Sequence, residues 1–251
     1  MQAQHNEQKN NNNTTIDPSE IQNFAKDSSR WWDENGPFKP LHRLNPVRMS
    51  YIKKQICDHY KHDFEQLNAL DGLKILDIGC GGGLVSESLA RMGATITGAD
   101  ADENAINTAR AHAEGTGLEI EYKCGNAADI DNKFDVVCAL EIIEHVTDPN
   151  DFISLCKDKL KPGGLLIMST LNRTPKSYAL GIIAAEYLLR WVPRGTHTWS
   201  KFLKPSEITR YARQYGLTPH DVTGLIFNPI KNEFELSNTD LDVNYLITLC
   251  D

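Results

Sequence analysis

Two carboxylates and an imidazole follow a strongly apolar segment near the middle of the chain. The apolar segment is Phe134–Leu140, and Glu141, Glu144 and His145 come directly after it. If the chain turns into a helix here, the three residues are spaced i, i+3 and i+4 and share one face. Such an oxygen-rich set favours Mg²⁺ or Mn²⁺. A cation there would stabilise the phenolate of a hydroxyl whose pKa is otherwise near ~10. We therefore predict that these three residues are catalytic and bind a metal.

The same three residues also fit two roles that need no metal. His145 could act as a general base on its own. Alternatively, Glu141 and Glu144 are acids that favour a helix N-terminus, and His145 is a packing residue. The position supports a functional role, because open α/β sheets bind their ligands at the carboxyl ends of the strands.

A glycine-rich loop that joins a strand to a helix is the second candidate site. Gly79 and Gly81 follow the apolar strand Lys74–Ile78, and such loops bring backbone N–H groups close to a ligand. The dinucleotide pattern would need a glycine where Leu84 stands, and Asp77 would face a pyrophosphate. S-adenosylmethionine has no phosphate and carries two cationic groups. The loop therefore favours S-adenosylmethionine over NAD, and a NAD-dependent oxidoreductase remains the alternative.

Polar residues after the next two strands suit the same ligand. Asp100 ends the segment 95–100 and stands 21 positions after Gly79, close to the ~20 expected of the acid that binds ribose hydroxyls. Asn126 follows the third strand, where an amide could bind the adenine edge, although a polar turn accounts for it nearly as well. We predict that Asp77, Gly79, Gly81, Asp100 and Asn126 bind the cofactor.

Strand and helix patterns alternate around these loops. This alternation predicts an α/β, Rossmann-like fold with a mostly parallel central sheet of about seven strands and helices on both faces. The predicted strands are Lys74–Ile78, 95–99, 120–123, Phe134–Leu140, 165–169, 220–227 and 243–249. The predicted helices are Leu84–Arg91, 103–114, 148–160 and 205–215, after N-terminal helices at 17–25 and 47–60.

The ends of the chain and its composition set further limits. Residues 1–16 are polar and Asn-rich, which predicts a disordered tail before a single domain at 17–251. The net charge of −8 argues against a basic nucleic-acid-binding surface. Six cysteines without a Cys-x-x-Cys pair indicate free thiols in a reducing compartment. No apolar run has the length of a membrane span, so we expect a cytoplasmic protein.

An insert at 172–204 interrupts the alternation after the fifth strand. Residues 177–192 are apolar around almost the whole of a helix, and 173–204 contain six basic residues against one acid, Glu186. This combination favours an interfacial helix that contacts anionic lipid. A lid over an apolar substrate, or a helix packed on its own domain, would give the same pattern.

These motifs resemble known families. The region 75–169 resembles the Rossmann-like class I methyltransferases in its loop, acid, apolar fourth strand and Lys161-Pro162-Gly163-Gly164 turn. The flanking segments resemble the O-methyltransferases of ubiquinone biosynthesis from about Ile21 to Leu249. The strings that carry this resemblance are Arg30-Trp31-Trp32-Asp33, Phe38-Lys39-Pro40-Leu41-His42-Arg43-Leu44-Asn45-Pro46-Val47-Arg48, Ser169-Thr170-Leu171-Asn172-Arg173, Gly195-Thr196-His197, Lys201-Phe202-Leu203-Lys204-Pro205, Thr223-Gly224-Leu225, Asn228-Pro229-Ile230 and Asp242-Val243-Asn244-Tyr245.

The resemblance implies both O-methylation steps of that pathway, with methyl transfer from S-adenosylmethionine to polyprenylated phenol or catechol intermediates. It implies that Arg48, Gly79, Asp100 and Leu140 contact the cofactor, with Arg48 on its carboxylate. It also implies that Glu141, Glu144 and His145 bind the metal, expected to be Mg²⁺. The 173–204 insert would contact anionic lipid, so that a cytoplasmic bacterial enzyme associates peripherally with the inner membrane. Contacts with other enzymes of the pathway are compatible with that location.

Overall fold

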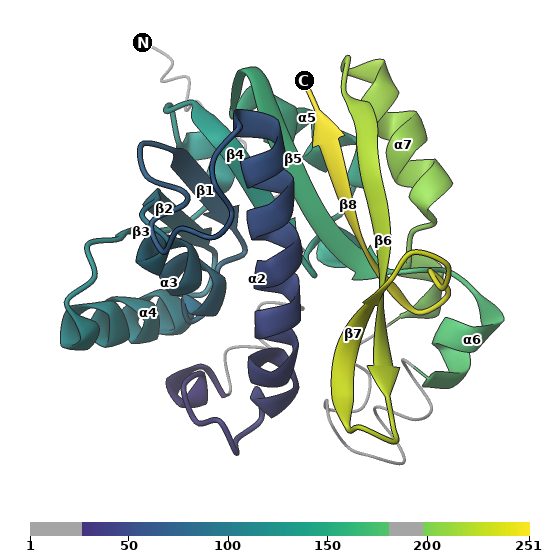
Figure 1. Ribbon diagram of the computed structural model, residues 1–251, viewed down its shortest axis with the longest axis horizontal. Coiled ribbons are helices and arrows are strands. Elements are labelled where there is room, and N and C mark those ends of the chain that lie inside the picture. The colour runs from purple at the N-terminus through teal and green to yellow at the C-terminus, as the bar shows by residue number, and fades with distance from the viewer. Residues whose placement is uncertain (1–26, 181–197) are drawn as a thin grey trace, which may run out of the picture.

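The first five strands form the parallel half of a single sheet. The computed structural model describes residues 27–180 and 198–251 (Figure 1). Strands β1, β2 and β4 carry the predicted site residues at their carboxyl ends, and β3 and β5 flank them. The bounds are β1 Lys74–Ile78, β2 Thr95–Asp100, β3 Glu121–Cys124, β4 Phe134–Leu140 and β5 Leu160–Leu171.

Three antiparallel pairings complete the sheet on the side of β5. The strand order is β3-β2-β1-β4-β5-β8-β6-β7. Strands β6 (Thr218–Asn228) and β8 (Asn244–Cys250) match the two late strands predicted from sequence, and β8 pairs antiparallel to both β5 and β6. The sequence did not predict the edge strand β7 (Glu233–Ser237). Eight strands with helices on both sides confirm the predicted fold class.

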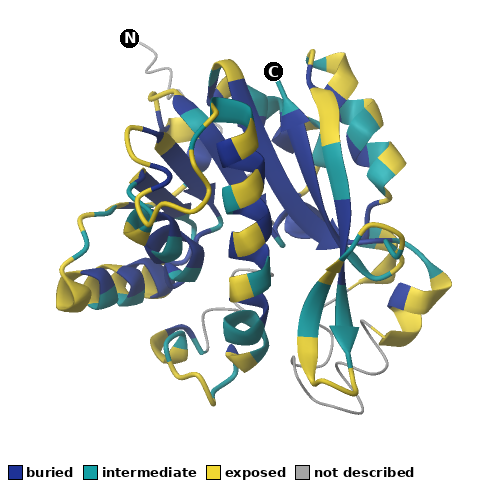
Figure 2. Cartoon of the chain, in the orientation of Figure 1, coloured by how far each residue is buried: buried dark blue, intermediate teal, exposed yellow. Residues whose placement is uncertain are grey.

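Alternating side chains along the strands separate two large cores. On β5, Leu165 and Ile167 pack into a core with helix α2 (Lys39–Tyr60), whereas Leu166 and Met168 pack into a core on the opposite face. The central strands are buried along most of their length (Figure 2). The helices that cover the sheet are α2, α3 (Leu84–Arg91) and α4 (Glu103–Thr116) on one face and α5 (Pro149–Asp158) and α7 (Pro205–Gln214) on the other.

Helix α2 begins earlier than predicted. We expected the helix to start at 47, after the Gly- and Pro-containing stretch 36–46, but α2 starts at Lys39 and includes Pro46. Pro40 lies in the first turn, where the missing N–H costs nothing. Leu44 and Asn45 are buried, and this packing outweighs the single hydrogen bond that Pro46 removes. The longer helix extends the element that holds Arg48.

Some predicted segments fall outside the described residues. The tail at 1–16, the helix at 17–25 and most of the apolar segment 177–192 lie there. Within the described parts of the chain, no helix has the length and apolar character needed to cross a membrane.

Candidate functional site

The glycine loop lies where three parallel strands end together. Ile78 of β1 pairs with Ala99 of β2 and with Ala139 of β4, so the strands' carboxyl ends meet at one edge. In the loop that follows, Gly79 and Gly81 have φ of 74° and 53°, which side chains disfavour. A Cβ on Gly79 would also lie 2.5 Å from the Ile142 side chain. Both features disfavour a side chain at this position.

Asp100 is fixed by backbone donors at the same edge. The N–H of Gly81 donates to Oδ2 of Asp100 at 2.8 Å, and the N–H of Asp102 donates to Oδ1 at 2.9 Å. Burial raises the pKa of Asp100, while these two N–H donors lower it. Each carboxylate oxygen retains acceptor capacity. Asp100 therefore both shapes the glycine loop and offers acceptors for paired hydroxyls.

A buried acid and a buried cation lie behind the loop. Asp77 is 2% exposed and accepts a hydrogen bond from Ser86 of α3 at 2.6 Å. Burial raises the pKa of Asp77 to about 6, against the opposing effects of Ser86 and of the Arg48 charge. Arg48 on α2 is 4% exposed, and its Nε has no partner among the described residues. Burial lowers the pKa of Arg48, and the charges of Glu141 and Asp77 oppose this shift.

The chain turns sharply where β4 ends. Leu140 is the last residue of the strand, and Glu141 has φ of 53°, a conformation that costs a non-glycine residue ~1–3 kcal/mol. Two donors converge on Oε1 of Glu141: Ser169 Oγ at 2.6 Å and Asn244 Nδ2 at 3.1 Å. Asn244 begins β8, which starts at this edge because it runs antiparallel to β5. Donors from two strands, β5 and β8, thus fix the Glu141 carboxylate.

The predicted shared face of Glu141, Glu144 and His145 is not present. The positive φ of Glu141 excludes a continuous helical turn, and only Ile143–His145 form a short 3₁₀ helix, η3. Glu144 accepts from Thr170 at 2.8 Å, whereas Glu141 accepts from Ser169. Ser169 and Thr170 are consecutive on β5, so their side chains point to opposite faces of the sheet. The expectation of one shared face was therefore wrong.

This arrangement does not fit the predicted magnesium site. Residues 27–180 and 198–251 contain no group of three His, Cys, Asp or Glu side chains placed to hold a metal ion. Glu144 and His145 are 3% and 8% exposed, and Glu144 already accepts a hydroxyl hydrogen bond. The described residues therefore do not provide the converging oxygen ligands that Mg²⁺ requires.

Some residues at this edge of the sheet have a role that local sequence patterns did not predict. The Asn126 side chain accepts from the N–H of Ala128 and caps a short 3₁₀ helix, η2 (Ala127–Asp129), so its contact with adenine stays a prediction. Ser169 and Asn244 stood out only as members of strings that resemble the family. No local spacing links them to Glu141, because their proximity depends on the pairing of β5 with β8.

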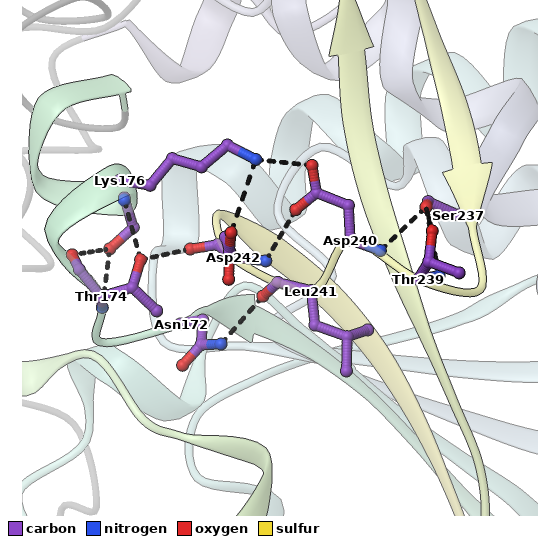
Figure 3. A network of polar contacts seen from close by, with 9 residues as sticks. Asn172, Thr174, Lys176, Ser237, Thr239, Asp240, Leu241 and Asp242 are labelled. Atoms are coloured by element: carbon purple, nitrogen blue, oxygen red, sulfur yellow. Dashed lines mark hydrogen bonds and ion pairs between the residues drawn. The ribbon is translucent and has the colours of Figure 1, made fainter.

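Polar contacts tie the insert to the loop between β7 and β8 (Figure 3). Lys176 of the short helix α6 (Pro175–Ser177) forms ion pairs with Asp240 at 2.5 Å and Asp242 at 3.6 Å. Thr174 donates to the carbonyl of Asp242, and Asn172 donates to that of Leu241. These contacts fix the start of the insert at the edge of the sheet that holds Glu141.

Both ends of the insert are also joined to each other. Trp199 Nε1 donates to the carbonyl of Thr174 at 3.0 Å, and its ring meets that of Tyr178 edge to face at 6.2 Å. Tyr178 and Leu180 are each 48% exposed and Trp199 is 37% exposed. The described ends of the insert therefore present apolar side chains to the surroundings.

Comparison with known proteins places the fold among methyltransferases. A family model described as a methyltransferase domain matches residues 76–168. The chain is similar in fold to the magnesium protoporphyrin IX methyltransferase of Synechocystis PCC 6803 with bound S-adenosylmethionine (TM-score 0.58, 19% identity, 90% of each chain covered). It is also similar to a SAM-dependent methyltransferase from Thermotoga maritima (TM-score 0.59, 18% identity, 88% and 97% covered).

Sequence relatives give a closer assignment. The chain is 50% identical to the ubiquinone biosynthesis O-methyltransferase of Dinoroseobacter shibae over 94% of this chain and 96% of that protein. It is 51% identical to the protein of the same name from Ruegeria pomeroyi over 92% and 95%. These relatives confirm the family predicted from the sequence and do not favour a NAD-dependent oxidoreductase. The chain belongs to the ubiquinone biosynthesis O-methyltransferases, which are S-adenosylmethionine-dependent enzymes.

Proposed function

We propose that this enzyme methylates hydroxyl groups of polyprenylated phenol and catechol intermediates, in both O-methylation steps of ubiquinone biosynthesis. The names of the relatives support the pathway. The observation that carries the cofactor assignment is Arg48, a buried cation whose Nε has no partner in the described structure. A buried donor without a hydrogen-bond partner is costly unless a ligand supplies the acceptor. The carboxylate of S-adenosylmethionine is such a ligand.

The residues at the edge of the sheet suit the other parts of this cofactor. Asp100 would accept the ribose hydroxyls, because both of its oxygens are oriented by backbone donors. Gly79, Gly81 and Leu140 would contact the cofactor through backbone that approaches it closely. Asp77 would place negative charge near its cationic end, and Asn126 remains our candidate for the adenine edge.

Position and proton transfer would be the contributions of the protein to the reaction. When bound, S-adenosylmethionine supplies a methyl group activated by a sulfonium. The protein must hold the phenol oxygen in line with that group and accept its proton. Glu141 is our first candidate, because two donors fix its Oε1 and leave Oε2 for the proton. His145 is the second, because imidazole is the side chain best suited to accept protons near neutrality.

The insert would bring the enzyme to a substrate whose polyprenyl tail lies in a membrane. Its charge pattern supports contact with anionic lipid, and Tyr178 and Leu180 are exposed where the described residues end. We infer that a cytoplasmic enzyme associates peripherally with the inner membrane through 173–204. Contacts with other enzymes of the pathway would form there.

Titration and turnover together test this proposal. Isothermal titration should show binding of S-adenosylhomocysteine and none of NADH. With a 2-polyprenyl-6-hydroxyphenol and a 3-demethylubiquinol analogue, methyl transfer should occur to the hydroxyl oxygen. Absence of S-adenosylhomocysteine binding would overturn the cofactor site. Binding without methylation of either analogue would overturn the substrate assignment.

A further inference from the structure

Two adjacent tryptophans cover the glycine loop from the N-terminal side. Trp31 packs so closely that a Cβ on Gly81 or on Gly82 would lie 2.4 Å or 2.3 Å from its atoms. Trp32 donates its Nε1–H to the carbonyl of Gly82 at 2.9 Å. Gly82 has no positive φ, so this packing accounts for its lack of a side chain. The glycines at 81 and 82 thus make room for the indole of Trp31.

A chain of contacts holds Trp32 in place. Its ring stacks on His112 of α4, with centroids 3.4 Å apart and planes at 6°. His112 Nδ1 donates to Oε1 of Glu87 at 2.6 Å, and the Glu87 side chain is 2% exposed. Because a carboxylate can only accept, this contact fixes the orientation of the imidazole. Glu87 lies on α3, the helix that directly follows the glycine loop.

Further contacts join the same segment to α2 and to Asp100. His42 of α2 donates from Nε2 to the carbonyl of Trp31 at 2.7 Å. Ser28 donates to the carboxylate of Asp102, whose own N–H donates to Asp100. The segment therefore contacts α2 and α4 directly and is linked to α3 through His112. Through Asp102, the segment is also connected to Asp100, the acid that we assign to the ribose hydroxyls.

We propose that the segment Ser28–Trp32 is a positioning element for the cofactor, with Trp32 as its principal residue. The hydrogen bond to the Gly82 carbonyl fixes the Gly82–Gly83 peptide, two peptide units after the one whose N–H, that of Gly81, holds Asp100. Trp32 thereby sets the shape of the loop before the cofactor arrives, which lowers the cost of ordering it on binding. This inference rests on the proposed cofactor site.

The substitution Trp32→Phe tests this proposed role of Trp32. A phenyl ring can still stack on His112, but it has no N–H to donate to the Gly82 carbonyl. We expect the Kd for S-adenosylhomocysteine and the KM for S-adenosylmethionine to rise about five-fold, as for one lost hydrogen bond. The kcat and the KM for the phenol should stay unchanged, with a similar Tm. Tyr60→Phe is the matched control, because it removes a hydrogen bond to the Asp135 carbonyl at the opposite edge of the sheet.

A second substitution keeps the test informative if Trp32→Phe folds poorly. His112→Leu removes the stacking partner and should raise the same KM. In the double variant, the KM for S-adenosylmethionine should rise by less than the product of the two single rises, because both substitutions act through the same chain of contacts. An unchanged KM for S-adenosylmethionine in folded variants, or an equal rise in both KM values, would overturn the inference. If Asp100→Ala also left S-adenosylhomocysteine binding intact, the cofactor site itself would be wrong.

Discussion

The backbone N–H of Gly81 donates to the carboxylate of Asp100 at 2.8 Å. This bond joins two motifs that lie apart in the sequence, the glycine loop after β1 and the acid that ends β2. Because β1 and β2 are parallel and in register, their carboxyl ends present the loop and the acid side by side. A substitution that removes both Asp100 oxygens will therefore alter both the proposed ribose acceptor and the loop.

Asp100→Asn and Asp100→Ala should weaken cofactor binding to different extents. Asparagine keeps one acceptor oxygen, and we expect the Kd for S-adenosylhomocysteine to rise about ten-fold for the loss of one charge-assisted hydrogen bond. Alanine removes the loop anchor as well, and a rise of about a hundred-fold or more is expected. Isothermal titration measures both. Asp135→Asn, at the amino end of β4, is the control, and equal affinities for all three variants would contradict the assignment.

Arg48→Met should separate ligand binding from folding. Loss of the buried charge relieves desolvation, and this gain opposes the lost attraction to Glu141 and Asp77. We therefore expect the Tm of the unliganded protein to stay within about 3 °C of wild type. The stabilisation that saturating S-adenosylhomocysteine gives to wild type should largely disappear, because that shift depends on Kd. A preserved ligand-induced shift would show that Arg48 does not bind the carboxylate.

Asp77 should make the protein less stable as the pH rises. Its folded pKa is raised from 3.8 to about 6, so the unfolded chain releases this proton first. The cost of ionising the buried group is absent below pH 3.8 and complete above about pH 6. Two pKa units correspond to about 3 kcal/mol. Asp77→Asn, which keeps an acceptor for Ser86, removes this cost.

Urea unfolding at about pH 4.5 and about pH 7.5 measures the effect. The free energy of unfolding of Asp77→Asn minus that of wild type should increase by about 2 kcal/mol between these two pH values. The same subtraction for Asp58→Asn, an exposed position on α2, controls for general charge effects. A difference that falls with rising pH would mean that Asp77 is ionised at lower pH than its burial indicates.

Local sequence patterns predicted most of the fold. The strands Lys74–Ile78 and Phe134–Leu140 and the helix Leu84–Arg91 have the predicted bounds, because an apolar run or a helical period specifies each of them directly. The predicted start of α2 was too late because proline has a low helix propensity. Tertiary packing nevertheless keeps Pro46 inside the helix. The edge strand β7 has a mixed burial pattern and little apolar signal.

The site was less predictable where it depends on contacts between distant residues. The i, i+3, i+4 spacing of Glu141, Glu144 and His145 assumed a helix, and the positive φ at Glu141 cannot be inferred from glutamate. Asn244 lies 103 positions from Glu141, so only the antiparallel return of β8 brings them together. The cover of the glycine loop by Trp32 likewise depends on how the N-terminal segment packs.

Glu141→Gln should affect turnover and leave cofactor binding unchanged. Glutamine fills the same space at the end of β4 but cannot take up a proton from the phenol, so we expect kcat to fall about a hundred-fold, within the usual contribution of a general base. The Kd for S-adenosylhomocysteine should stay within about two-fold of wild type. Asn244→Ala removes one of the two donors to Oε1, and a smaller loss of kcat is expected. A wild-type kcat in Glu141→Gln would assign the proton to His145.

Membrane contact should depend on the exposed apolar residues at the start of the insert. Tyr178 and Leu180 are each 48% exposed, and burying such side chains in a lipid interface contributes roughly 1–2 kcal/mol each. We expect Tyr178→Ser with Leu180→Ser to reduce flotation with anionic vesicles by about ten-fold or more. Leu67→Ser is the matched control, because Leu67 is 90% exposed between α2 and β1, away from the insert. Equal loss of flotation in the control would point to general exposure of apolar side chains, and unchanged flotation in the double variant would remove these residues from the membrane-contacting surface.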